Sequence, residues 1–252
     1  MFAKPFIMYK YRETLYRNYY LTHSGTTDES AQLSHFKQQV RYFKMEFEKQ
    51  LPKDKSCNIL DIGCGTGSLI KGLNELGYLN TAGVDLSEEQ VAMSKTFGVD
   101  NIEHGDVREY LRGKQSSFDL IFAVDLIEHL GKDELVEFLA MVKKALKPGG
   151  LVIFRTPNMD APQASVFAFA DFTHEVFLNK SSSIQLMESS GFKDVTISEG
   201  IVFIENPLKE LMRKLGWSIT KWRLKLQLFY TARTWHDVLF TPNIVIVGRN
   251  PK

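Results

Sequence analysis

The chain has 252 residues, of which 44% are hydrophobic and 24% charged, and its formal net charge is +1. This composition is typical of a soluble globular protein and excludes disordered and collagen-like chains. The balanced charge disfavours a general nucleic-acid-binding surface, and no apolar run reaches transmembrane length. The two cysteines, Cys57 and Cys64, indicate buried thiols in a reducing compartment. We therefore expect a cytoplasmic protein with one domain over 1–252.

The first strong helical pattern lies near the N-terminus. Aromatic and basic residues alternate through the first 32 positions, and a helix is predicted over about 34–50. Its apolar side chains recur at steps of four, three and four residues, which places them on one helical face. They are Phe36, Val40, Phe43 and Phe47. We expect 1–52 to form an N-terminal helical segment before a core over 53–203.

From residue 57 onward, strand patterns alternate with helical patterns. The predicted strands are 57–62, 81–85, 101–104, 118–124, 151–156, 195–203 and 244–248. Residues 147–150, with the sequence Lys-Pro-Gly-Gly, are expected to end a helix before the fifth strand. Such alternation predicts an α/β, Rossmann-like fold with a seven-stranded, mostly parallel sheet and helices on both faces.

Two connections are longer than a minimal sheet requires: 157–179 after the fifth strand, and an insertion at 204–242 before the last strand at 243–252. Both leave from carboxyl ends of strands, where open α/β sheets bind their ligands. We expect them to select the substrate.

A glycine-rich turn follows the first strand. Asp61 ends the strand, and Gly63, Gly65 and Gly67 follow it. Glycines let the backbone approach a ligand closely. The spacing is not the G-x-G-x-x-G of dinucleotide sites, because residue 68 is serine. A carboxylate at Asp61 would also repel a diphosphate and favour a cationic ligand, which disfavours a nicotinamide oxidoreductase.

Acidic residues also end the next three strands. Asp85 precedes Leu86, Asp106 precedes Val107, and Asp125 follows the fourth strand. Asp85 and Asp106 could instead cap the helices that come next. A shared position at the strand ends favours one binding site over separate caps.

Together these features resemble motif I and the acidic strand ends of class I S-adenosylmethionine (SAM)-dependent methyltransferases. The resemblance implies SAM as cofactor and S-adenosylhomocysteine as product. It implies that the glycines approach the amino-acid portion and that Asp61 accepts from its ammonium. It places Asp85 and Leu86 at the ribose, Asp106 and Val107 at the adenine, and Asp125 beneath the sulfur.

Further segments resemble two methyltransferase groups. The segment 126–130 (Leu-Ile-Glu-His-Leu) is similar to an element of quinone-precursor O-methyltransferases. The segments 155–158, 171–177 and 16–23 resemble bacterial surface-polysaccharide methyltransferases. The latter resemblance implies methylation of a hydroxyl on a polysaccharide sugar or glycolipid intermediate. The alternatives are O-methylation of a quinone precursor or other small molecule, N-methylation of a protein or amine, and a non-catalytic SAM-binding role.

His174 is the expected general base, because a neutral imidazole can accept the proton of a hydroxyl nucleophile. Asp171 and Glu175 flank it, and either could orient its ring. His174 could instead hydrogen-bond the backbone and fix its loop. For His129, we expect a buried structural role.

Asp125, Glu128 and His129 could gather a divalent ion, but the set is thin and we expect no metal. By resemblance, the N-terminal helical segment 1–52 is expected to form a lid, with His23 and the neighbouring tyrosines folded over the cofactor. The alternative is an ordinary aromatic helix packed on the edge of the sheet.

Seven Lys and Arg residues lie between Glu205 and His236, interleaved with leucines and tryptophans. The first half of this segment has helical spacing, whereas 222–228 alternates as a strand would. The segment is interpreted either as a cap whose apolar face covers the domain or as a peripheral contact with anionic membrane. Nucleic-acid binding is disfavoured, because no recognised module is present.

Overall fold

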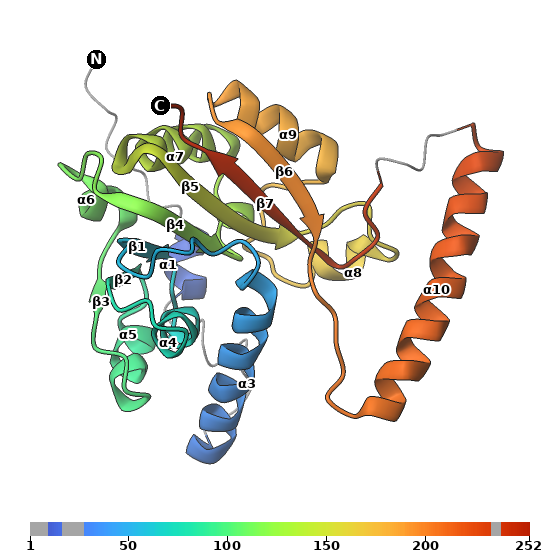
Figure 1. The fold of residues 1–252 in the computed structure, drawn as a ribbon, viewed down its shortest axis with the longest axis horizontal. Helices are drawn as coiled ribbons and strands as arrows, with labels where there is room; N and C mark the ends of the chain where they lie inside the picture. The colour runs from blue at the N-terminus through green and yellow to red at the C-terminus, as the bar shows by residue number, and fades with distance from the viewer. Residues whose placement is uncertain (1–9, 17–27, 233–237) are drawn as a thin grey trace. The chain divides into compact units, whose positions relative to one another are not determined.

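The computed structural model describes residues 10–16, 28–232 and 238–252 (Figure 1). Its strands are β1 (Ile59–Ile62), β2 (Thr81–Asp85), β3 (Ile102–His104), β4 (Phe118–Val124), β5 (Leu146–Pro157), β6 (Lys193–Glu199) and β7 (Asn243–Arg249). Its helices are α1 (Lys10–Tyr16), α3 (Glu29–Phe47), α4 (Ser68–Glu75), α5 (Glu88–Thr96), α6 (Val107–Leu111), α7 (Lys132–Ala145), α8 (Ala164–Ala168), α9 (Lys180–Ser189) and α10 (Pro207–Tyr230), with a 3₁₀ turn, η1 (Ile127–His129).

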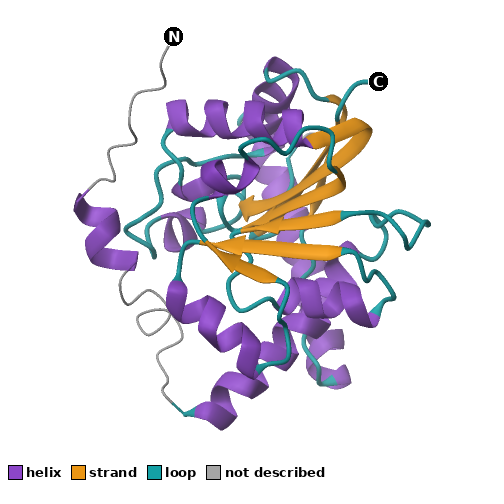
Figure 2. Ribbon diagram, turned by 90° about the vertical axis from the view of Figure 1, so that its left-hand side faces the viewer, coloured by secondary structure: helices purple, strands orange, loops and turns teal. Residues whose placement is uncertain are grey.

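The strands, orange in Figure 2, form a seven-stranded sheet in the order β3-β2-β1-β4-β5-β7-β6. β1 pairs in parallel with β2 and β4, and β2 with β3. β7 runs antiparallel to both β5 and β6. The predicted mostly parallel α/β sheet is confirmed, and its strand order reverses between β1 and β4.

The chain divides into two compact units, and the division falls after Val124. It does not coincide with the predicted boundaries at 52/53, 203/204 and 242/243. The first unit comprises the described residues up to Val124 together with Lys144–Lys147. In it, α3 packs on α4, and Phe36 and Val40 of α3 join a buried cluster with Ile70, Val91, Val99 and Ile102. α3 begins at Glu29, five residues earlier than predicted, because the Asp28 carboxylate caps it by accepting from Ala31 N at 3.0 Å.

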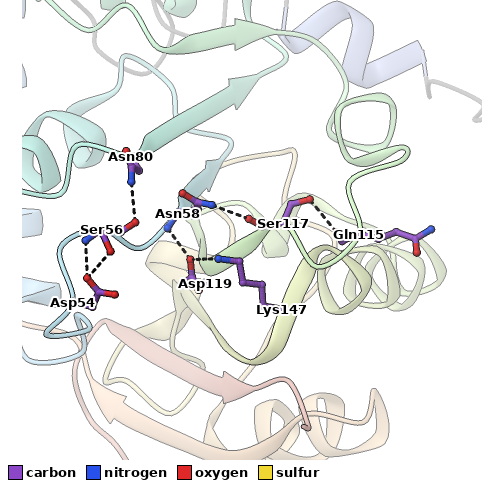
Figure 3. Close-up of polar contacts among 8 residues, drawn as sticks. All are labelled: Asp54, Ser56, Asn58, Asn80, Gln115, Ser117, Asp119 and Lys147. Atoms are coloured by element: carbon purple, nitrogen blue, oxygen red, sulfur yellow. Dashed lines mark hydrogen bonds and ion pairs between the residues drawn. The ribbon is translucent and has the colours of Figure 1, made fainter.

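A polar network ties together the amino ends of β1 and β4 (Figure 3). The Asp119 carboxylate accepts from Asn58 N at 2.8 Å and from Lys147 Nζ at 2.6 Å. Asn58 Nδ2 donates to the carbonyl of Ser117 at 3.3 Å. These contacts fix the register of the two strands, so their opposite, carboxyl ends are held in a defined arrangement.

The second unit comprises Asp125–Lys143 and Pro148–Lys252, and its β5 is longer than predicted. The expected helix stop at 147–150 is wrong, because this segment is the first part of the strand. Gly149 N donates to Asn250 O at 3.0 Å, and Asn250 N donates to Gly150 O at 2.8 Å. Gly149 has φ +80°, a conformation that glycine adopts without side-chain strain, so the extension can form.

The insertion between β6 and β7 forms one continuous helix through Tyr230, so the strand alternative for 222–228 is wrong. The helix begins after Asn206, whose side chain accepts from Lys209 N at 3.0 Å, and Pro207 occupies its first turn. The cap interpretation required a buried apolar face, but no residue of α10 is buried. Among the described residues, none of the helices combines the length and apolarity needed to cross a bilayer.

Candidate functional site

The glycine turn after β1 adopts a backbone that other residues disfavour. Gly63, Gly65 and Gly67 have φ values of 68°, 54° and 80°. A Cβ at Gly67 would lie 2.6 Å from Ile102 Cδ1 and 2.9 Å from a Val99 methyl group. Both the left-handed conformation and the close packing therefore require glycine at this position. The turn leads directly into α4, and its N-cap residue, Gly67, has no side chain to accept from the first amides of the helix.

Asp61 is the most unusual carboxylate of the first unit. It is 2% exposed, and its Oδ1 atom is buried without a hydrogen-bond partner. Burial, followed by the nearby charge of Asp85, raises the pKa of the Asp61 carboxyl well above its usual range. A buried carboxylate is costly unless it is paired. The orphaned oxygen beside a glycine turn fits the ammonium of a bound amino acid, as the expected SAM would supply.

Asp85 holds the same turn from the end of β2. Its two carboxylate oxygens accept from Gly65 N at 2.7 Å and from Ser87 N at 2.8 Å. Ser87, not Asp85, is the N-cap residue of α5. Burial raises the pKa of Asp85, and the two amide hydrogen bonds oppose this rise. Each oxygen keeps a lone pair for a ligand hydroxyl, and Leu86 beside it is exposed.

Asp106 adopts the capping role that was the structural alternative for it. Its side chain caps α6, accepting from Arg108 N at 2.8 Å, and pairs with the Arg108 guanidinium. Burial acts to raise its pKa, but the hydrogen bonds from Arg108 lower the pKa overall. Val107 is the first residue of α6. The carboxylate is therefore already engaged, and a role at an adenine remains a prediction.

In the second unit, the chain turns sharply as it leaves β4. Asp125 has φ 52°, unusual for a residue with a side chain. Its carboxylate forms a two-point ion pair with Arg155 of β5, in which Arg155 Nε donates at 2.9 Å. The Asp125 amide also donates to the Arg155 carbonyl at 3.0 Å. The sequence showed Arg155 only as the first residue of the segment 155–158. Its ion pair with Asp125 gives it a structural role.

Glu128 lies three residues further, in η1, and is 2% exposed. Its Oε2 atom is buried and has no hydrogen-bond partner. Burial, followed by the charge of Asp125, raises the pKa of Glu128 from 4.5 to about 8. The carbonyl of the same residue accepts from Glu175 N at 2.7 Å and from Val176 N at 3.1 Å. The loop after α8 is thus attached to η1.

This attachment brings together two histidines that are far apart in sequence. The rings of His129 and His174 lie 4.8 Å apart between centroids, at an interplanar angle of 63°. The His174 Nδ1 donates to the carbonyl of Ala168 at 3.1 Å. Because a carbonyl oxygen only accepts, the proton of a neutral His174 ring is on Nδ1 and the lone pair on Nε2.

The ring of His129 is oriented through a short chain of hydrogen bonds. Thr173 donates its hydroxyl proton to Asp171 Oδ1 at 2.7 Å, so its oxygen accepts from His129 Nδ1, also at 2.7 Å. Burial, followed by the charge of His174, lowers the pKa of His129 to about 4. His129 is therefore neutral at pH 7, with its proton on Nδ1.

The orientation of the His174 ring by Asp171 or Glu175 stays a prediction. Asp171 acts through Thr173 on the other histidine, and Glu175 is exposed and contacts η1 through its amide. The Ala168 carbonyl accepts from His174, a backbone contact of the kind that the loop-fixing alternative describes. Sequence reasoning missed Thr173, although its place between Asp171 and His174 in one motif was visible.

The same cluster is the candidate cation site of the described residues. Ligand atoms of Glu128, His129 and His174 all lie within 4.8 Å of one another. Two imidazole nitrogens and a carboxylate oxygen are suitable ligands for a divalent transition metal. The sequence suggested Asp125 as the third member, but its carboxylate pairs with Arg155 and His174 takes that place.

Known proteins with related sequences and folds support a single family. A family model described as a methyltransferase domain matches residues 34–197. The ubiquinone biosynthesis O-methyltransferase of Hydrogenovibrio crunogenus is 25% identical over 190 residues, covering 69% of this chain and 76% of that protein. A SAM-dependent methyltransferase structure from Archaeoglobus fulgidus has a TM-score of 0.62 at 21% identity, covering 83% of this chain and 94% of the other.

Phosphoethanolamine N-methyltransferase 2 of Haemonchus contortus, solved in complex with SAM, has a TM-score of 0.62 at 18% identity. The match covers 94% of this chain and 60% of that one. The family model spans most of the chain and includes the glycine turn and Asp61. This protein belongs to the methyltransferase domain family and is a class I SAM-dependent methyltransferase.

Proposed function

We propose that this methyltransferase methylates a phenolic hydroxyl, with a quinone precursor as the acceptor class. The choice of acceptor rests on the curated relatives, several of which are ubiquinone biosynthesis O-methyltransferases. This favours the quinone alternative over the polysaccharide sugar that segments 155–158 and 171–177 suggested. A glycan hydroxyl is the competing acceptor.

SAM, when bound, supplies a methyl group already activated on a sulfonium. The chain's residues then have to bind, align and exclude water. The Asp61 carboxylate accepts from the ammonium, the glycine turn allows the backbone to approach, and Asp85 accepts from ribose hydroxyls. Support for Asp61 comes from its buried, unpartnered Oδ1 atom.

For the proton of the acceptor hydroxyl, we propose Nε2 of His174. Its Nδ1 proton is directed at Ala168, which leaves the Nε2 lone pair as the accepting site. His174 is half-buried and so more accessible than His129, which is 8% exposed. The lowered pKa of His129 also makes that ring a poor base at pH 7. Asp171 is proposed to position His129 through Thr173, and Glu175 to hold the loop on η1.

The acidity of the acceptor hydroxyl favours a phenol over a sugar as the methyl acceptor. A phenol has a pKa of about 10 and an imidazole about 6.5, so full transfer of the proton costs about 5 kcal/mol. An alkyl hydroxyl resembles water, whose pKa is about 15.7, and the same transfer costs about 12 kcal/mol. A lone imidazole can therefore assist a phenol much more effectively.

The test is methyl transfer from labelled SAM to a panel of catechols, nucleotide sugars, lipid-linked glycans and amines. We expect label in the catechol fraction. His174→Ala should lower kcat by about 100-fold with little change in SAM affinity, whereas Glu137→Gln on the exposed face of α7 should retain activity. Label in the glycan or amine fraction alone would reject the phenol, and SAM binding without transfer to any fraction would favour a non-catalytic role.

A further inference from the structure

Helix α10 presents an apolar stripe to solvent (orange-red in Figure 1). The side chains of this outer stripe recur at helical spacings of three and four residues, and all are 55–75% exposed. They are Leu208, Leu211, Met212, Leu215, Ile219, Trp222, Phe229 and Tyr230. Exposed apolar side chains are ordinary singly, but a stripe along a 24-residue helix marks an interaction surface.

The opposite side of the same helix is the side that contacts the rest of the second unit. The half-buried residues on this side are Glu210, Arg213, Trp217, Lys221, Leu224 and Leu228, whereas Leu226, also half-buried, lies on the outer face by helical spacing. Lys221 Nζ lies 3.3 Å from Glu199 of β6, and Glu210 accepts from Ile204 N at 2.9 Å. The attached face thus carries fewer apolar residues than the face turned outward. This arrangement is the reverse of a cap, in which the apolar face is turned inward.

The charges beside the outer stripe indicate the kind of surface that would bind it. By helical spacing, Lys209 and Arg223 border the outer stripe on one side, and Lys214 and Lys225 border it on the other. The one acidic residue of α10, Glu210, lies on the attached face and pairs with Arg213 at 2.7 Å. The exposed surface of the helix therefore combines apolar area with positive charge on both edges and carries no acidic side chain.

We propose that α10 is a peripheral membrane-binding element whose outer stripe inserts into the interface of an anionic phospholipid bilayer. The apolar stripe would enter the headgroup boundary while the bordering basic residues contact lipid phosphates, as interfacial amphipathic helices do. Trp222 and Tyr230 suit this boundary, because such rings have an apolar body and a polar end. A second copy of the chain is a poorer occupant, since stripe-to-stripe contact would bring two sets of basic residues together.

The test is flotation of the full-length protein with vesicles of phosphatidylcholine alone or of phosphatidylcholine mixed with phosphatidylglycerol. We expect binding to the mixed vesicles at low salt and little binding to phosphatidylcholine alone. Each basic residue near an anionic surface contributes about fivefold to binding, so the double variant Lys209→Gln, Arg223→Gln should weaken it about 25-fold. The matched charge control is Lys95→Gln, Lys132→Gln, at exposed positions outside α10.

The contribution of the apolar stripe is tested with the double variant Leu215→Glu, Ile219→Glu, which should abolish flotation with the vesicles. Its control places the same change at Leu79 and Val136, which are exposed outside α10. Unchanged SAM affinity and circular dichroism establish that each variant is folded. Absence of binding to anionic vesicles, or equal loss in variant and control, would overturn the proposal. So would a dimer in sedimentation that only the Leu215→Glu, Ile219→Glu variant dissolves, because it would assign the stripe to a second copy.

Discussion

At the residue scale, the carboxylates of the candidate site divide into those with partners and those without. Asp85, Asp106 and Asp125 accept hydrogen bonds or ion pairs, whereas Asp61 Oδ1 and Glu128 Oε2 have none. A buried acceptor without a partner costs about 1–3 kcal/mol, and more if it is charged. Such positions are retained where a ligand supplies the missing contact. Among the carboxylates of the candidate site, Asp61 Oδ1 and Glu128 Oε2 are therefore the atoms at which we expect a ligand contact.

The variant Asp61→Asn tests whether the carboxylate beside the glycine turn binds the ammonium of SAM. The amide keeps the shape but loses the charge, so the hydrogen bond to the SAM ammonium loses about 1.5–3 kcal/mol, or roughly 10–150-fold in Kd. Folding stability should be unchanged or raised, because the buried charge is removed. Calorimetry with SAM measures the Kd, and Asp100→Asn is the control at an exposed position. Unaltered SAM affinity in Asp61→Asn would remove it from the cofactor site.

Glu128 makes stability depend on pH. Its pKa rises from 4.5 to about 8 on folding, so the folded state holds a proton that the unfolded state releases. Its stabilising effect is complete below about pH 4.5 and is lost as pH rises toward 8. His129, whose pKa falls to about 4, acts oppositely, losing stability as pH falls below about 6.5. Between pH 6.5 and 8, the Glu128 effect is therefore observed without that of His129.

The corresponding prediction is that the thermal midpoint of the wild type falls between pH 6.5 and 8, and that Glu128→Gln flattens this fall. Glutamine cannot ionise, so the difference between the two proteins isolates Glu128 from other groups such as Asp61. The full rise from 4.5 to about 8 corresponds to about 5 kcal/mol. Glu137→Gln on the exposed face of α7 should behave as the wild type. Parallel pH curves for Glu128→Gln and wild type would contradict the assignment.

At the element scale, the sequence predicted what depends on local spacing and missed what depends on distant partners. All seven strands and the glycine turn follow from alternation and from apolar runs. The early start of β5 could not be predicted, because it depends on hydrogen bonds to Asn250, about one hundred residues away. Likewise, the pairing of His129 with Thr173 joins residues 44 positions apart. The expected lid at His23 is a separate case, since 17–27 lie outside the described residues.

Two glycine substitutions should have opposite effects at this scale. Gly149 has φ +80° and no atom closer than 3.9 Å to an added Cβ, so Gly149→Ala introduces backbone strain of about 1–2 kcal/mol without a steric clash. Gly216 lies inside α10 with no atom within 4 Å of an added Cβ, so Gly216→Ala should stabilise that helix by about 1 kcal/mol. Denaturant unfolding measures the first change, and hydrogen exchange of α10 amides measures the second. A stabilising Gly149→Ala would show that its left-handed backbone is not needed.

At the scale of the whole molecule, the near-neutral net charge conceals an uneven distribution. The chain as a whole is at +1, yet α10 carries six basic residues and one acidic residue. The remainder is therefore net acidic. An anionic surface would attract one helix and repel the rest, which favours a single orientation on a bilayer. The balanced composition disfavoured a general nucleic-acid-binding surface, but a sum over the chain does not reveal one charged element.

The membrane and acceptor proposals together predict a dependence on how the acceptor is presented. Quinone precursors with long apolar tails reside in bilayers. We therefore expect α10 to affect turnover only when the acceptor is embedded in a bilayer. Leu215→Glu, Ile219→Glu should retain wild-type turnover on a short, water-soluble catechol and lose at least tenfold on a long-tailed catechol embedded in anionic vesicles. High salt should reproduce that loss in the wild type, because the distance over which charges attract falls from about 10 Å at 0.1 M to about 3 Å at 1 M and weakens the attraction of the bordering Lys and Arg residues to the anionic surface. An equal loss of turnover on both acceptors would place α10 in the catalytic machinery instead. If the wild type methylates neither catechol, the phenolic acceptor is rejected, and the vesicle-binding result is unaffected.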